Sequence, residues 1–154
     1  MKRNILLGLI SAATAASMLA MPVYANELAT ELTTTVESTY TLEIPANNGI
    51  TYGIESTAIG EISVTGNVLP TDAVTVTATT DAFKNQSQSG VEDLPFTLRD
   101  TSGDVFTDAT WNGAEINGQT KAIELNVDIT SADWQAAAAG TYAGSIIFTA
   151  AINN

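Results

Sequence analysis

The sequence contains neither cysteine nor histidine. Without cysteine no disulfide can form, so the stability of the fold has to come from packing alone. The lack of both residue types also excludes Ser-His-Asp and Cys-His nucleophilic sites and the usual zinc and copper ligand sets. A carboxylate pair of the glycosidase type is still available, but nothing marks two of the seventeen acidic residues as such a pair. We therefore expect no enzymatic activity and no resident cofactor.

Positive charge is also scarce. Five Lys and Arg residues stand against seventeen Asp and Glu residues, and two of the five, Lys2 and Arg3, lie at the N-terminus. The others are Lys84, Arg99 and Lys121. So acidic a chain repels the phosphates of nucleic acids and anionic lipids, and we expect it to bind neither. The same field favours solubility and can attract cations or basic partners.

One long apolar run stands at the N-terminus. It follows Lys2 and Arg3, is rich in alanine, and closes on Val23-Tyr24-Ala25, which fits a small-residue cleavage site. This pattern predicts a secretory signal peptide at residues 1–25. The alternative, a membrane anchor, is disfavoured because polar residues interrupt the run and Pro22 ends it. We expect a secreted or non-covalently attached cell-surface protein with no membrane span after cleavage, and an exported chain without cysteine points to a bacterial source.

The residues after the signal are enough for one domain with its own core. Residues 26–36, "NELATELTTTV", are polar and rich in threonine, which predicts an N-terminal arm or an edge strand. Apolar and polar residues alternate from there on, so we assign residues 37–154 to a single β-domain.

Period-two alternation runs through this domain. It is clearest in "STYTLEIP", "GEISVTG", "AVTVTATT", "PFTLRD" and "KAIELNVDI", each with one apolar face and one polar face. Turn residues separate the segments, and the pair Asn117-Gly118 predicts a two-residue hairpin. Six or seven short strands of this kind predict an antiparallel β-sandwich or a partly closed barrel.

The segment "SADWQAAAAG" predicts one short helical turn before the last strand. Ser131 can cap its start, and Gly140 can close it in the left-handed conformation. So short a helix needs a docking partner, and we expect Trp134 to be buried as its anchor. From Gly140 to Ile152 the even positions are almost all apolar, which predicts a long core strand.

The stretch Gly140-Thr141-Tyr142 resembles the tyrosine corner of immunoglobulin-like β-sandwiches, where a tyrosine near a strand start bonds back to the upstream backbone. The longer segment "ADWQAAAAGTYAGSIIFT" resembles the C-terminal strand of small exported bacterial surface proteins, including fimbrial-type subunits and the WxL group. The resemblance implies an all-β, antiparallel immunoglobulin-like sandwich. Neither Trp111 nor Trp134 stands in a Trp-x-Leu motif, so peptidoglycan binding is not implied.

Three aspartates form a candidate metal site. Asp100, Asp104 and Asp108 surround the turn at Gly103, and calcium prefers such oxygen ligands. The spacing does not match the EF-hand pattern, so a solvated loop is the alternative.

Two functions fit these features. The first is a non-catalytic structural or adhesive protein of a bacterial surface or extracellular matrix, binding other surface proteins or copies of itself. Leu28, Leu32 and Val36 of the arm would then add to the open sheet edge of a neighbour, although the arm can equally fray or pair within its own chain. The second is a soluble carbohydrate-binding module with Trp111, in the turn "TWNG", as an exposed glycan platform; Trp111 can instead cover the end of the core.

Overall fold

The computed structural model describes residues 31–46 and 49–153, so the predicted signal peptide and Leu28 lie outside the described residues. Residues Thr35–Asn154 form one compact unit. The regular structure of the described part is mostly β-strand, with two short helices, which confirms the all-β prediction. Its elements, in chain order, are β1 (Thr39–Glu43), β2 (Ser56–Asn67), β3 (Ala73–Asn85), β4 (Thr97–Asp100), β5 (Asp108–Asn112), α1 (Gly113–Gly118), β6 (Ala122–Asp128), α2 (Ser131–Ala136) and β7 (Tyr142–Asn153).

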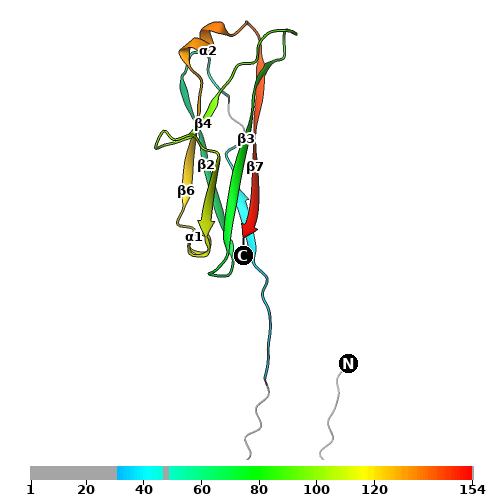
Figure 1. Ribbon diagram of the computed structural model, residues 1–154, viewed down its shortest axis with the longest axis vertical. Coiled ribbons are helices and arrows are strands. Elements are labelled where there is room, and N and C mark those ends of the chain that lie inside the picture. Colours follow the sequence, from blue (N-terminus) through cyan, green and yellow to red (C-terminus); the bar gives the residue numbers. More distant parts are fainter. Residues whose placement is uncertain (1–30, 47–48, 154) are drawn as a thin grey trace, which may run out of the picture. The chain divides into compact units, whose positions relative to one another are not determined.

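The strands form two sheets in which every pairing is antiparallel. One sheet has the order β1-β2-β6-β4, and the other has the order β5-β3-β7. Figure 1 shows α2 at one end of the two sheets and α1 at the other, which we call the α2 end and the α1 end. Strand β7 begins at the α2 end and finishes at the α1 end, where Asn153 pairs with Ala73.

Both sheets contribute to one hydrophobic core. Ile62, Val64 and Leu125 of the first sheet and Val74 and Val76 of the second are essentially inaccessible to solvent and belong to the same cluster. These residues occupy the apolar positions of the alternating segments, so the predicted faces of β2, β3 and β6 are correct. The domain is therefore sandwich-like, with two sheets closing over a shared interior.

Strand β7 differs from its prediction. It lies at the edge of its sheet, paired only with β3 among the described strands, and none of its residues is fully buried. Its even positions from Tyr142 to Ala150 are half-buried, apart from Gly144, because no further strand covers them. The prediction of a core strand was therefore wrong, although the choice of inward face was right.

The predicted hairpin at Asn117-Gly118 was also wrong, because these residues end helix α1. Asn112 caps this helix: its Oδ1 accepts from the Glu115 amide at 3.0 Å, and the Asn112 amide donates to Glu115 Oε2 at 2.8 Å. This reciprocal capping box satisfies two amides that a helix start leaves unpaired. The Asn117 side chain bonds the amide and the carbonyl of Val68, both at 2.9 Å, and so fixes the helix to the end of β2.

Helix α2 forms where a helical turn was expected, but with different ends. Thr130, not Ser131, is its N-cap, and it stops at Ala136, so Gly140 lies beyond it with a φ of +151°. Trp134 is buried as predicted, and its indole N–H donates to the Ile54 carbonyl at 3.0 Å.

The Tyr142 hydroxyl donates to the Ala138 carbonyl at 2.9 Å, which is the backward bond predicted for a tyrosine corner.

Candidate functional site

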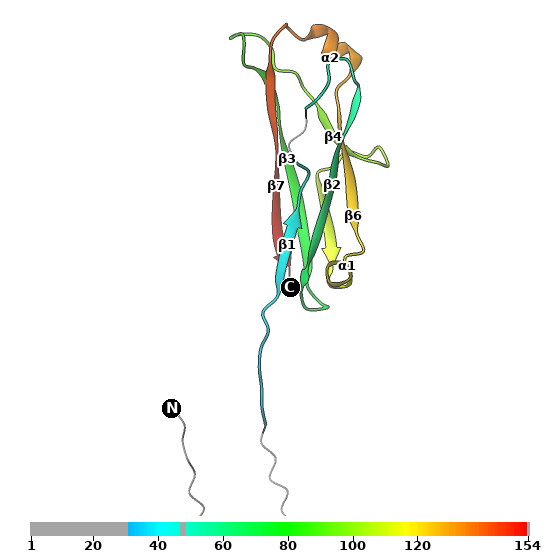
Figure 2. The same ribbon diagram turned by 180° about the vertical axis from the view of Figure 1, so that it is seen from behind.

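The candidate functional site is the outer edge of strand β7, where the backbone groups have no partner strand among the described residues. Its inner edge pairs with β3 from Tyr142 to Asn153, whereas no strand of the described residues pairs with its outer edge. Near the α1 end β1 lies beside β7, and the Tyr40 hydroxyl donates to the Ala150 carbonyl at 3.3 Å (Figure 2). Toward the α2 end, beyond Glu43, no strand lies there in the described part. Unpaired backbone groups along a strand edge form a template for another strand.

Two hollows lie along the face of β7 that points into the sandwich. The corner hollow, of about 640 Å³, lies beside the loop between α2 and β7 and is lined by Tyr52, Trp134, Gly140 and Tyr142 among others. The edge hollow, of about 460 Å³, lies further along β7 and is lined by Ile44, Gly144, Ile146 and Phe148 among others.

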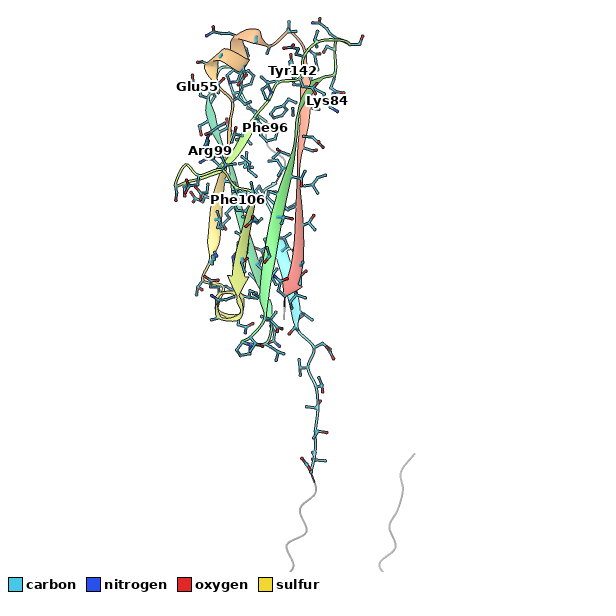
Figure 3. All side chains as sticks on the ribbon, in the orientation of Figure 1. Glu55, Lys84, Phe96, Arg99, Phe106 and Tyr142 are labelled. Carbon is cyan, nitrogen blue, oxygen red and sulfur yellow. The ribbon has the colours of Figure 1, made fainter. Side chains whose placement is uncertain are left out.

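The two hollows are neighbours, because Ile50 and Phe83 line both. Phe83 packs on Phe96 with ring centroids 5.1 Å apart, and Figure 3 shows Phe96 between the two sheets with Tyr142 nearer the α2 end. Neither lining includes an acidic or basic residue. The hollows therefore suit apolar side chains rather than ions.

Gly144 lets the ring of Phe83 pack directly against the backbone of β7. A Cβ at this position would lie 2.9 Å from the ring of Phe83 and 3.0 Å from the Asp81 carbonyl oxygen, so only glycine fits beside them. A glycine within a strand often marks a place where another backbone approaches closely. This glycine was the sequence signal for the site, since it interrupts the large side chains of an otherwise alternating strand.

The two arm candidates that the structure describes, Leu32 and Val36, are exposed to solvent. Leu32 is 89% exposed and Val36 is 71% exposed, and no strand forms in residues 31–38. Ser38 is fixed to the turn between β2 and β3: its Oγ donates to Asp72 Oδ2 at 2.7 Å and accepts from the Leu69 amide at 3.1 Å. The chain thus enters the sandwich at the α1 end, where β7 finishes.

The three calcium candidates are not brought together. Asp100 Oδ1 accepts from the amides of Ser102 and Asp104, at 2.9 and 3.1 Å, as in an ordinary side-chain-stabilised turn. Asp108 lies at the start of β5 and accepts from the Thr107 hydroxyl instead. Across residues 31–46 and 49–153 no three acidic side chains are placed to hold a metal ion. Asp104 alone lies in the exposed turn between β4 and β5, whereas Asp100 ends β4 and Asp108 begins β5.

Trp111 is not an exposed platform, and that prediction was wrong. Its side chain is 0% exposed, and its indole N–H donates to the Lys121 carbonyl at 2.9 Å. The alternative, a tryptophan that covers the end of the core, is confirmed. Among the described residues the exposed aromatic ring is Tyr52, which is 74% exposed at the rim of the corner hollow and packs edge-on against Trp134 with ring centroids 5.3 Å apart.

No protein-family model matches the chain, and no curated protein matches it in sequence. Within the residues that the structure describes, no helix has the length and apolar character needed to cross a membrane.

Proposed function

We propose that this is an exported, non-catalytic structural or adhesive protein of a bacterial surface or extracellular matrix, which acts through protein–protein contacts at the outer edge of β7. The observation that carries the proposal is the long edge strand beside two adjoining apolar hollows. Such an edge offers backbone hydrogen bonds for affinity and pockets for alternate side chains, the two components of recognition by strand addition.

An immunoglobulin-like assignment supports this choice of edge. In that fold the strands A, B, E and D form one sheet and C, F and G form the other. The order β1-β2-β6-β4 matches A-B-E-D, and β3 beside β7 matches C beside F. Tyr142, at the start of β7, then occupies the tyrosine-corner position at the start of F. In this assignment β5 lies on the other side of β3, the strand that corresponds to C. Strand G would lie beside the outer edge of β7, where the described residues contain no strand.

The sequence supports the proposed location and partners. The N-terminal run has the features of a secretory signal, so we place the protein outside the cytoplasm, secreted or held non-covalently at the cell surface. Its partners would be other surface or matrix proteins or further copies of itself. The strong excess of acidic residues opposes contacts with nucleic acid and anionic lipid.

A matched pair of β7 variants tests this function. Ile146 lines the edge hollow, whereas its neighbour Ile147 is 55% exposed and lies on the opposite face of the strand. We expect the secreted protein to self-associate with concentration in light scattering, and Ile146→Lys to weaken that association about tenfold or more because a charge enters the apolar hollow. Ile147→Lys adds the same charge outside it and should change association far less, and urea unfolding verifies that both variants fold. A wild-type protein that stays monomeric at every concentration would contradict self-association at this edge.

Binding of carbohydrate is the second candidate function. The exposed Tyr52 ring at the rim of the corner hollow favours it, since sugar rings stack on exposed aromatic faces. A glycan array tests it: a signal that Tyr52→Ala abolishes supports this function, and the absence of any signal for the wild-type protein rejects it.

A further inference from the structure

The corner hollow has an aromatic lining. Tyr52, Phe83, Trp134 and Tyr142 all contribute their rings to it. One of the two tryptophans and two of the four tyrosines of the chain therefore meet at this one hollow. Its volume of about 640 Å³ lies within the range of small-molecule sites. The lining thus offers a small ligand several aromatic surfaces at once.

Tyr52 and Trp134 form two walls of this hollow. Their ring planes meet at 69°, with the ring centroids 5.3 Å apart, so the pair makes a corner rather than a flat stack. Tyr52 is 74% exposed, which leaves most of its ring open to a ligand. The indole N–H of Trp134 is already bonded to the Ile54 carbonyl, and the Tyr142 hydroxyl donates to the Ala138 carbonyl. These donors are used within the chain, so the rings offer a ligand π surface rather than hydrogen bonds.

Acidic side chains adjoin the hollow in the sequence without lining it. Asp133 directly precedes Trp134, and the exposed Glu92 and Asp93 directly precede a further lining residue. Lys84 is the only basic residue of the described chain that stands next to a lining residue. The chain as a whole carries a formal net charge of −12. Its field attracts cations to the hollow and repels anions from it.

The uncharged lining restricts which cation fits. Metal ions need oxygen ligands, and a primary ammonium group is strongly hydrated and carries three donors, yet no carboxylate lines the hollow. A quaternary ammonium group differs from these ions, because methyl groups cover its charge and it has no proton to donate. Aromatic faces attract such a group through the ring quadrupole, and several rings together form the cage that recognises it. The aromatic lining and the acidic surroundings therefore favour the same ligand.

We propose that the corner hollow binds a quaternary ammonium group, such as that of choline, with Tyr52 and Trp134 as aromatic walls. This inference goes beyond the proposed function, because a ligand in the hollow needs no contact at the outer edge of β7. It also names a ligand for Tyr52 that differs from a glycan in its positive charge.

An uncharged isostere tests the role of the charge. In neohexyl alcohol a carbon atom replaces the nitrogen of choline, so shape and methyl surface stay the same. In an NMR titration of the secreted protein we expect choline to bind in the millimolar range or tighter, with amide shifts concentrated at Tyr52 and residues 134–142. Neohexyl alcohol should bind about tenfold more weakly or worse, because it lacks the cation–π attraction. Equal affinities for the two compounds, or no choline binding, would overturn the inference.

Two variants of Tyr52 test the role of the ring. Tyr52→Ala removes one wall and should weaken choline binding about fivefold or more. Tyr52→Phe is the matched control, since it keeps the ring and should bind choline within about threefold of the wild type. The residue is 74% exposed, so we expect both variants to fold, and urea unfolding verifies it. Unchanged binding by Tyr52→Ala, or equal losses in both variants, would overturn the aromatic wall.

Phosphocholine distinguishes two sources of the same group. Free choline has a net positive charge, whereas the headgroup of a lipid or a surface polymer carries the quaternary ammonium beside a phosphate. We expect choline to bind more tightly than phosphocholine, because the acidic surroundings repel the phosphate. Tighter binding of phosphocholine would overturn the role assigned to the surrounding carboxylates.

The outcomes are independent of the tests of association. A protein that binds choline and stays monomeric supports this inference and contradicts self-association at the edge of β7. A protein that associates through that edge but binds no choline overturns this inference and leaves the proposed function standing.

Discussion

Replacement of Trp111 by alanine should destabilise the domain strongly, because the structure makes this residue part of the core rather than of a binding surface. The side chain is 0% exposed, and its indole N–H bonds the Lys121 carbonyl at 2.9 Å. Truncation of a buried tryptophan to alanine costs about 3–5 kcal/mol through lost transfer free energy and the cavity left behind. A domain of this size has a free energy of unfolding of about 5–15 kcal/mol, so the variant loses a large fraction of it.

Trp111→Phe is the matched control. It keeps most of the buried ring but leaves the Lys121 carbonyl without the indole donor, a loss of about 1–3 kcal/mol. Urea unfolding measures both variants, with the fluorescence of Trp134 as a probe that neither substitution removes. A Trp111→Ala protein within about 1 kcal/mol of the wild type would refute the assignment to the core. Loss of glycan binding by a variant of unchanged stability would revive the platform interpretation.

Three smaller perturbations follow from named contacts. Tyr142→Phe removes the hydroxyl bond to the Ala138 carbonyl and should lower the free energy of unfolding by about 1 kcal/mol in urea titrations; no change would mean that the corner is not held by this bond. Asn112→Ala removes one half of the capping box with Glu115 and should cost about 1–2 kcal/mol by the same assay, whereas a neutral result would contradict the capping role. Millimolar calcium should leave the melting temperature unchanged in calorimetry, because Asp100 and its two partner candidates do not gather; a rise of several degrees would show that they do.

Much of the fold could be predicted from the sequence because the alternation of apolar and polar residues shows which face of a strand is buried. The apolar positions of "AVTVTATT" and "KAIELNVDI" became the inward faces of β3 and β6. The backward bond of Tyr142 could be predicted because Ala138 lies only four residues upstream. Burial of Trp134 could be predicted because so short a helix needs a docking partner, although its bonding partner, Ile54, lies 80 residues away in the sequence. The immunoglobulin-like arrangement and the exported location stay predictions.

The errors lie where the sequence signal fits two structures. Asn117-Gly118 suits a hairpin turn, but Asn112 and Glu115 complete a capping box that starts a helix instead. Strand β5 was missed because "TWNG" was interpreted as a turn, whereas Trp111 lies in the strand and pairs with Val74 of β3, which is distant in the sequence. Apolar alternation in β7 shows which face points inward, but it does not show whether a neighbouring strand covers that face. Strand order depends on contacts between distant residues, so the open edge emerged only from the structure.

The molar mass of the secreted protein over a concentration series tests the central claim most directly. If the β7 edge is the contact site between copies of the chain, light scattering will show a mass that rises with concentration, and the Ile146→Lys variant will stay closer to the mass of one chain than Ile147→Lys does. A wild-type protein that keeps the mass of a single chain up to the highest concentration reached would contradict the account.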